Sequence, residues 1–464
     1  MRRSPAAWAA VAPAGDASSG PPVRCSAEPP ATLSRTVAIF APRSPASHAA
    51  SAPVEPAEAA APDPLAALAG LVPDIAAAAA REDQDGAFPA ASLAALHRAG
   101  LLLAPLGPVR GDQVRGDQGP GDQVRGDQVR GDQVRGDQVR GNKGVGGQGW
   151  GSRPAGAAPL LRALRLLGRA SLPLGRLYEG HVNALRLVQR HGTAAQVAAA
   201  AQDAAAGRLF AVWNTDPPGE PPLALGADGR LAGRKVLCSG AGHVARAVVT
   251  ARAAADAPPV MVLVALAPGQ RAALAGWTAQ GMRASASGAV AFDGIAVTAA
   301  MRLGEPGDYT RQPEFSAGAW RFAAVQCGGV EAVLDALRDH LRHTGRGGDP
   351  HQAARLGQAA MAAETARLWV AAAAARAEAD PVPPDAAGYV NLARLAVERA
   401  ALDVLELAQR SVGLAAFLRP NPLERLGRDL ATYLRQPAPD RALAMAAAEV
   451  LAAPPAAGDL WDPA

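Results

Sequence analysis

The sequence predicts a mainly helical α+β protein, in which a helical N-terminal domain, a middle antiparallel β-domain and a C-terminal four-helix bundle follow one another. Two changes in the spacing of apolar residues predict this order. Apolar residues recur every three or four positions up to residue 207, form short β-branched runs over 208–312, and return to helical spacing over 313–455. Because 49% of the 464 residues are hydrophobic, the chain can bury a sizeable core.

The first 62 residues precede this pattern and are rich in Ala, Pro and Ser, without helical or strand periodicity. Such a composition is typical of a disordered extension. The start, MRRSPAAWAAVAPAG, has an Arg pair and small residues, but Pro5, Pro13 and a short apolar run argue against a signal peptide. We therefore expect a cytoplasmic protein with a disordered N-terminal extension over 1–62 and a short tail over 456–464.

Charge and cysteine content argue against several classes of protein. The 46 basic and 42 acidic residues nearly balance, and no basic stripe is interleaved with aromatic residues, so nucleic-acid binding is not predicted. Cys25, Cys238 and Cys327 are far apart and form no CxxC pattern, which suits a reducing compartment. The eight histidines show no metal-binding spacing, so no metal site is predicted. No run of 18 apolar residues occurs, which predicts no membrane-spanning helix.

The helical N-terminal domain is predicted over 63–207. LAALAGLVPDIAAAAARED and FPAASLAALHRAGLLLAPLG have apolar residues at the spacing of amphipathic helices. Pro89 suits a helix start and Gly100 a helix stop. After an interruption, helical spacing returns in APLLRALRLLGRAS, GRLYEGHVNALRLVQRHG and TAAQVAAAAQDAAAG.

The interruption is a tandem repeat of five-residue VRGDQ units over 109–143. A period of five matches neither the helical period of 3.6 nor the strand period of 2, so the units cannot present one buried face. Their burial is too slight to offset the entropy of ordering, which predicts a disordered insert in a surface loop. The RGD tripeptide permits a cell-adhesion interpretation, but expansion of a short tandem repeat is favoured.

The β-domain is predicted over 208–312 from short runs separated by Gly, Pro and Asp. The runs are LFAVWNT, GRLAGRKVLCSG, HVARAVVTARA, PVMVLVAL and GAVAFDGIAV, and they predict an antiparallel sheet. Over 313–455, three long Ala- and Leu-rich segments and a shorter fourth, RALAMAAAEVLA, predict a helical bundle.

This order of elements, together with several short motifs, resembles the acyl-CoA dehydrogenase flavoproteins. QGMRASASGAVAFDGIAV matches the end of the family's β-domain through Gly281–Ser285 and Val290–Val297. GAWRFAAVQCGGVEAVL, LRHTGRGGDPHQAARLG, QRSVGLAAF and LERLGRDL follow in family order. The resemblance covers residues 64–452 apart from the repeat, and it implies an acyl-CoA dehydrogenase-like fold.

The resemblance also implies an FAD cofactor between the β-domain and the bundle, and a homodimer or homotetramer in which the adenine end reaches a neighbouring subunit. Thr215 would contact the pyrimidine edge of the flavin and Ser239 its N5 edge. The remaining expected cofactor residues are Arg342 and Thr344 at the pyrophosphate, and Gln409 and Gly413 at the partner's FAD. Each also has a simple structural interpretation as a strand-end hydroxyl, a solvated charge or an exposed amide.

The sequence departs from the family at the catalytic base. Removal of an α-proton needs a carboxylate within reach, but Pro437 and Trp320 occupy the two places where family members supply one. Asp440 is a weak candidate for a displaced base, and Arg321 for a residue that organises the site. The prolines after Asp216 replace the flexible substrate loop of the family with a stiff one, and Leu237 replaces a Trp on the flavin face.

Two further motifs compete with these residues. Gly240–Ala245 has the GxGxxA spacing of a dinucleotide site, but the long helix that should follow is missing, which favours a turn. His181 and Glu179 could form a pair in a substrate pocket, although a buried, hydrogen-bonded His181 is favoured.

The resemblance thus predicts FAD-dependent oxidation of a CH–CH group in an acyl-CoA or acyl-carrier-bound substrate, without an identifiable base. Two alternatives remain open. A flavin-dependent monooxygenase or oxidase on the same fold needs no α-proton base, because reduced flavin reacts with oxygen. A non-catalytic binding paralogue needs no flavin.

Overall fold

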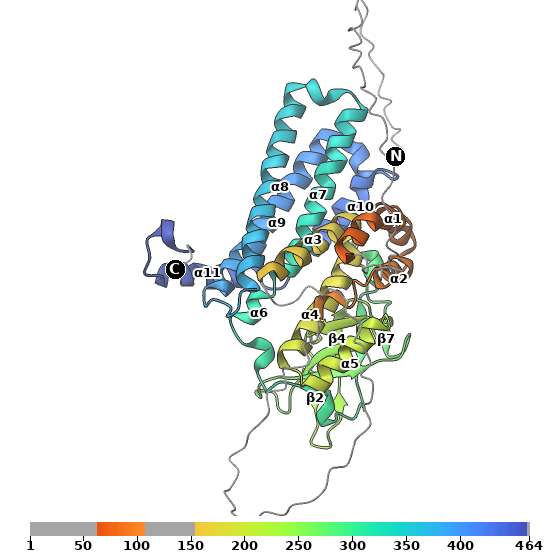
Figure 1. The fold of residues 1–464 in the computed structure, drawn as a ribbon. Helices are drawn as coiled ribbons and strands as arrows, with labels where there is room; N and C mark the ends of the chain where they lie inside the picture. Colours follow the sequence, from red (N-terminus) through yellow and green to blue (C-terminus); the bar gives the residue numbers. More distant parts are fainter. Residues whose placement is uncertain (1–62, 107–153, 462–464) are drawn as a thin grey trace, which may run out of the picture. The chain divides into compact units, whose positions relative to one another are not determined.

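The computed structural model describes residues 63–106 and 154–461 (Figure 1). The predicted extension 1–62 and the repeat 109–143 lie outside the described residues, as do the last three residues of the predicted tail. The described part is mainly helical, with small β-sheets between two groups of helices. This confirms the predicted fold class.

In the described residues, five helices precede the first strand, and local signals in the sequence set their ends. Asp63 caps the first helix, because its side chain accepts a hydrogen bond from the backbone N–H of Leu65 at 3.1 Å. Pro89 directly precedes the second helix, and Gly100, with a φ of 75°, lies just beyond its end, as predicted. The helices are α1 Pro64–Asp85, α2 Ala90–Arg98, α3 Pro154–Ala170, α4 Leu172–His191 and α5 Ala194–Ala205.

One of these helices, α1, is long and apolar enough to cross a membrane, and among the described helices it alone meets both conditions. Here α1 packs along α3, and its Leu68 and Ile75 lie in the largest hydrophobic core. The core helix of a soluble protein passes the same test of length and composition. The absence of a membrane-spanning helix therefore stays a prediction.

The strands form three small sheets. The first has the order β1-β5-β6-β9, the second β4-β8-β7, and β2 pairs with β3. Gly240–Ala245 forms a turn after β4, which confirms the turn interpretation of the GxGxxA motif. The strands are β1 Phe210–Trp213, β2 Ala224–Leu225, β3 Leu231–Ala232, β4 Arg234–Cys238, β5 Arg246–Ala251, β6 Val260–Ala265, β7 Ala272–Ala273, β8 Gly288–Ala291 and β9 Arg302–Leu303.

The prediction of an antiparallel domain needs one correction. β1 pairs with β5 in parallel, with Phe210 opposite Arg246, whereas the other named pairs are antiparallel. The reason is that β2, β3 and β4 intervene in the chain and belong to the other two sheets. This long crossover returns the chain to the edge of the sheet where β1 starts, so that β5 can run in the same direction as β1.

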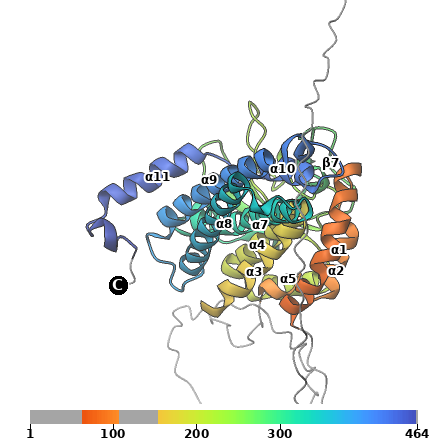
Figure 2. The ribbon, with the colours of Figure 1, turned by 90° about the horizontal axis from the view of Figure 1, so that it is seen from above.

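The C-terminal helices also differ from the predicted bundle. α7, α8 and α9 pack against one another, as expected, but α11 packs on α9 and not in the fourth position of a bundle (Figures 1 and 2). α3 and the unexpected α10 pack against α7 instead. Amphipathic spacing reports that a helix has a buried face, but not which helix covers it. The helices are α6 Glu314–Ala317, α7 Trp320–His343, α8 Pro350–Ala377, α9 Ala386–Val412, α10 Pro422–Tyr433 and α11 Pro439–Ala452.

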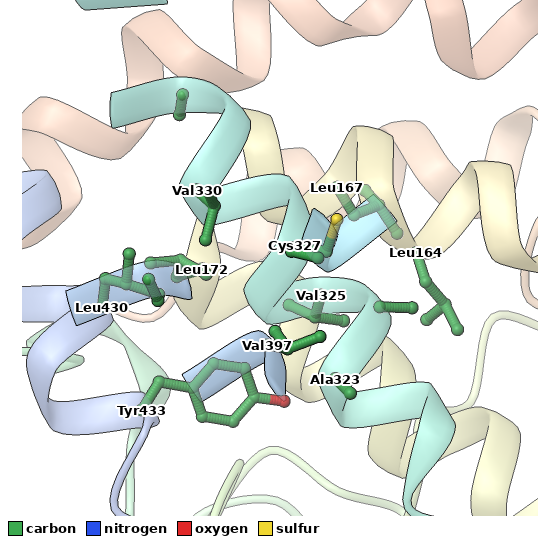
Figure 3. Packing of buried hydrophobic residues seen from close by; sticks show 14 of the residues in the cluster. Leu164, Leu167, Leu172, Ala323, Val325, Cys327, Val330, Val397, Leu430 and Tyr433 are labelled. Carbon is green, nitrogen blue, oxygen red and sulfur yellow. The ribbon is translucent and has the colours of Figure 1, made fainter. Parts of the chain in front are cut away.

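α7 is the central helix of the largest core (Figure 3). Val325 and Cys327 of α7 lie beside Leu164 and Leu167 of α3, and Leu430 of α10 lies on the other side of α7. This packing fixes the start of α7, where Arg321 lies.

Glycines allow α3 and α7 to approach closely. A Cβ atom at Gly168 of α3 would lie 2.0 Å from the backbone oxygen of Val325, and one at Gly328 of α7 would lie 2.1 Å from that of Arg165. Both distances are far below contact distance, so any side chain at either position would push the helices apart.

We expect Gly168→Ala to lower the free energy of unfolding by about 1–3 kcal/mol, the usual cost of overpacking a core. Urea denaturation followed by circular dichroism measures this change. The matched control is Gly357→Ala in α8, where an added Cβ meets no atom within 4 Å. The control should be neutral or stabilising by up to about 1 kcal/mol, because Ala favours the helix. Equal effects of the two substitutions would contradict the close approach of α3 and α7.

Candidate functional site

Helix α4 lies between the first sheet and α7, and its two faces have different roles. On the sheet side, His181 is fully buried: its Nε2 lies 2.7 Å from the carbonyl oxygen of Leu102, and its Nδ1 accepts a hydrogen bond from the backbone N–H of Phe210 at 3.1 Å. Burial lowers the pKa of His181 to about 4. These contacts confirm the interpretation of His181 as a structural core residue. They leave Glu179 without the proposed partner.

The opposite side of α4 faces a cavity of about 640 Å³. The start of α7, the segment 308–319, the first half of α9 and the segment 437–445 form its other walls. The lining includes five arginines, which are Arg186, Arg190, Arg321, Arg394 and Arg441, and three carboxylates, which are Glu179, Asp308 and Glu314. The cavity is therefore strongly charged, and its cations outnumber its anions.

Hydrogen bonds join α4 to α7 at this cavity. Glu179 is 1% exposed and pairs with Arg176 and with the side-chain amide of Asn183. The Asn183 side-chain oxygen in turn accepts a hydrogen bond from Nη1 of Arg321 at 3.0 Å. Polar residues at the spacing of Glu179, Asn183 and Arg186 share one helix face, and this signal in the sequence could have located the wall.

Glu378, at the C-terminal end of α8, completes this network. Its carboxylate accepts hydrogen bonds from Nη2 of Arg321 at 2.8 Å and from Nε1 of Trp320 at 3.1 Å, and it lies 3.3 Å from Nη2 of Arg186. Burial alone would raise the pKa of Glu378, but Arg321 and Arg186 together lower it below the usual value. Glu378 is therefore a structural counter-ion and not an available base.

The other acidic groups of the lining also have cationic partners. Asp308 lies 3.3 Å from Nδ1 of His191 and also pairs with Arg311, and Glu314 lies 3.6 Å from Nη2 of Arg190. Hydrogen bonding to the backbone of Glu305 is the main cause that lowers the pKa of Asp308. Among the described lining residues, each carboxylate thus lies within 4 Å of a cation, although Oε2 of Glu314 is buried without a hydrogen bond.

The two places expected to hold a base lie at or beside this cavity. Pro437 lines it, and Trp320 is buried next to Arg321, with its indole directed to Glu378. Asp440 is exposed in the first turn of α11, and it is not among the lining residues, whereas its neighbour Arg441 is. The geometry therefore gives no support to Asp440 as a displaced base.

The predicted flavin contacts Thr215 and Ser239 flank strand β4. The backbone N–H of Val236 donates to the carbonyl oxygen of Thr215 at 2.9 Å. The indole N–H of Trp213 donates to the carbonyl oxygen of Ser239 at 3.0 Å. Between them, Leu237 is 60% exposed, with a φ of 55°, where the register of β4 with β8 shifts. Such irregularities redirect side chains and are common beside active sites.

Ser239 lies close to the cavity. Val212 of β1 lines the cavity, and it also lines a small second pocket together with Trp213 and Ser239. An exposed apolar side chain between two hydroxyl groups suits a flat aromatic ring with polar edges. Thr215, Leu237 and Ser239 could therefore hold a flavin ring.

The other four predicted cofactor residues lie at the far ends of the bundle helices. Arg342 lies 21 residues beyond Arg321 on α7, so at 1.5 Å per residue the two are about 32 Å apart. Thr344 follows Arg342 and donates its hydroxyl to the carbonyl oxygen of His340 at 2.8 Å. Gln409 and Gly413 close α9. One copy of the chain does not bring these four residues to Thr215 and Ser239.

Comparisons with known proteins agree with this architecture. The family model described as "Acyl-CoA dehydrogenase, C-terminal domain" matches residues 308–434. The amino sugar nitrososynthase of Streptomyces peucetius is 32% identical over 238 residues, or 46% of this chain, and the chain spans 57% of the length of that relative.

Solved structures share the fold at low sequence identity. Butyryl-CoA dehydrogenase from Megasphaera elsdenii is 16% identical, covers 84% of this chain and 98% of its own, and has a TM-score of 0.65. A nitrososynthase from Micromonospora carbonacea var. africana is 24% identical. The match covers 86% of this chain and 98% of the nitrososynthase, with a TM-score of 0.64. Dibenzothiophene monooxygenase from Paenibacillus sp. A11-2 is 20% identical. The match covers 83% of this chain and 95% of the monooxygenase, with a TM-score of 0.63. The chain therefore has the acyl-CoA dehydrogenase-like fold, and residues 308–434 match the C-terminal domain of that family.

Proposed function

We propose that the protein is a flavin-dependent monooxygenase on the acyl-CoA dehydrogenase fold. The observation that carries the proposal is that neither expected base position in the described residues holds a carboxylate, while the three carboxylates that line the cavity each lie within 4 Å of a cation. A dehydrogenase must remove an α-proton with a positioned base. Here Pro437 and Trp320 occupy the two base positions, and Glu179, Asp308 and Glu314 are paired with cations.

Oxygen chemistry avoids this requirement. A reduced flavin, when bound, would supply the two electrons with which dioxygen gives one oxygen atom to the substrate and leaves the other, with two protons, as water. The protein then needs to hold the substrate beside the ring and to exclude bulk water. Arg186 and Arg321, which are largely buried and paired with Glu378, line the wall that would serve this purpose.

The names of similar proteins also favour a monooxygenase. A relative and a neighbour in structure are nitrososynthases, and another neighbour is a dibenzothiophene monooxygenase. Butyryl-CoA dehydrogenase is also a neighbour in structure, so oxidation of an acyl thioester is the competing function that the experiment below must separate.

The flavin would lie on Thr215, Leu237 and Ser239, with the apolar side chain against the ring and the hydroxyl groups at its edge. FMN needs no further contacts at the far ends of α7 and α9. FAD would need Arg342 and Gln409 of a second copy, and hence a homodimer or homotetramer. Analysis of the flavin released by denaturation, together with the mass of the assembly in solution, separates these two arrangements.

We expect the purified protein, supplied with oxygen, reduced nicotinamide and a flavin reductase, to oxidise amine or thioether substrates. Mass spectrometry with isotopically labelled dioxygen should find one labelled atom in the product. Without oxygen, a panel of acyl-CoAs should leave the flavin spectrum unchanged, because no base removes the α-proton. Bleaching by an acyl-CoA would instead establish a dehydrogenase. A protein that binds no flavin would be a binding paralogue.

We expect Leu237→Asn to weaken flavin binding about tenfold, since about 1.4 kcal/mol of apolar contact is lost. Asn tolerates a positive φ, so this change does not strain β4. Fluorescence titration with FMN and FAD measures the affinity. The matched control is Leu274→Asn, which alters another half-exposed leucine of the β-domain and should leave the affinity unchanged. An unchanged affinity in Leu237→Asn would remove Leu237 from the flavin site.

A further inference from the structure

One wall of the cavity, formed by α9 and the segment that leads into α11, carries polar groups that the protein itself does not satisfy. Asn391 lines this wall and is 3% exposed, yet its side chain makes no hydrogen bond within the described residues. A polar side chain that reaches a cavity can take its hydrogen-bond partner from the molecule that fills the cavity. Because Asn391 lines the cavity, a bound molecule can supply the partner of its amide.

Arg394 lies three residues further along α9, on the same face of the helix. Its guanidinium stacks over the ring of Phe322 at 5.2 Å, and its Nη2 donates to the carbonyl oxygen of Pro437 at 2.8 Å. Nε and Nη1 make no hydrogen bond with described residues. Arg394 is thus held in place while several of its donors remain free.

Arg441 lies on the same wall, four residues after Pro437, in the first turn of α11. Neither Arg394 nor Arg441 forms a salt bridge within the described part of the chain. The other three lining arginines differ, because Arg186 and Arg321 pair with Glu378 and Arg190 faces Glu314. Arg394 and Arg441 are therefore the two lining arginines that have no carboxylate partner among the described residues.

We propose that Asn391, Arg394 and Arg441 form a subsite for an oxyanion, a phosphate or carboxylate group on the molecule that occupies the cavity. An amide N–H and two guanidinium groups supply charge-assisted donors from one wall, and guanidinium donors match the oxygens of both groups. The subsite would fix one end of the ligand on α9 and direct the other end toward α4 and the β1 side of the cavity.

The inference rests on the proposed function only in taking this cavity as the ligand site. Its test uses flavin-free protein and neither oxygen nor reductant. Failure of the oxyanion subsite is therefore distinguishable from failure of the monooxygenase proposal.

Calorimetric titration with pyrophosphate and with succinate tests the subsite. We expect the wild-type protein to bind at least one of these probes, and Arg394→Gln combined with Arg441→Gln to weaken binding by about tenfold or more. The control is Arg399→Gln, which alters an exposed arginine on α9 that is paired with Asp403. Absence of binding by the wild type, or equal binding by wild type and double variant, would overturn the proposal.

Asn391→Leu separates ligand binding from a structural role. The leucine has a similar size and leaves no unpaired amide, so we expect an equal or higher resistance to urea together with weaker probe binding. Lower stability with unchanged binding would show that Asn391 serves only the fold, and would overturn its part in the subsite.

The anion could belong to the substrate or to the flavin phosphate. If the flavin supplies it, the double variant should bind FMN less tightly than the wild type but bind riboflavin equally well. If the substrate supplies it, both flavins should bind the double variant as they bind the wild type. Either result, together with probe binding, supports the subsite and assigns its source.

Discussion

The buried carboxylate of Glu378 is the interaction on which the site depends. It ends α8, and it accepts contacts from α4 through Arg186 and from α7 through Arg321 and Trp320. Removal of this carboxylate would leave two largely buried guanidinium groups without a counter-ion, which typically costs about 3–5 kcal/mol. Glu378 therefore helps to fix the relative positions of α4 and α7, which form two walls of the cavity.

The same pairing explains why a carboxylate beside Arg321 does not act as a base. Its oxygens are shared among two guanidinium groups and an indole N–H, and its pKa lies below the usual value. Glu179 is similarly engaged by Arg176 and Asn183. The acidic residues near the cavity thus stabilise its walls, which agrees with the proposed reaction that needs no carboxylate base.

The sequence predicted what depends on local pattern. Periodicity located most helices and most strands, and Pro89 and Gly100 marked the ends of α2. Sequence patterns did not predict contacts between distant segments. Glu378 follows Arg321 by 57 residues, and no spacing rule connects the two residues. Periodicity also placed α11 in the bundle, because the apolar spacing in RALAMAAAEVLA indicates a buried face but not which helix packs against it. Asn391 and Arg394 were missed for a related reason, since an amide three residues before an arginine is common on any helix.

The replacement of the expected base by Pro437 and the positive charge of the cavity are two aspects of one change. The carbonyl oxygen of Pro437 binds Arg394, and Arg441 follows four residues later. A carboxylate at position 437 would lie beside this arginine, which would lower its pKa and make it a weak base for an α-proton. Restoring an acidic residue alone would therefore not restore a dehydrogenase. The segment 437–441, together with α9, now presents donors and positive charge to the cavity, an environment that favours binding an anion over removing a proton.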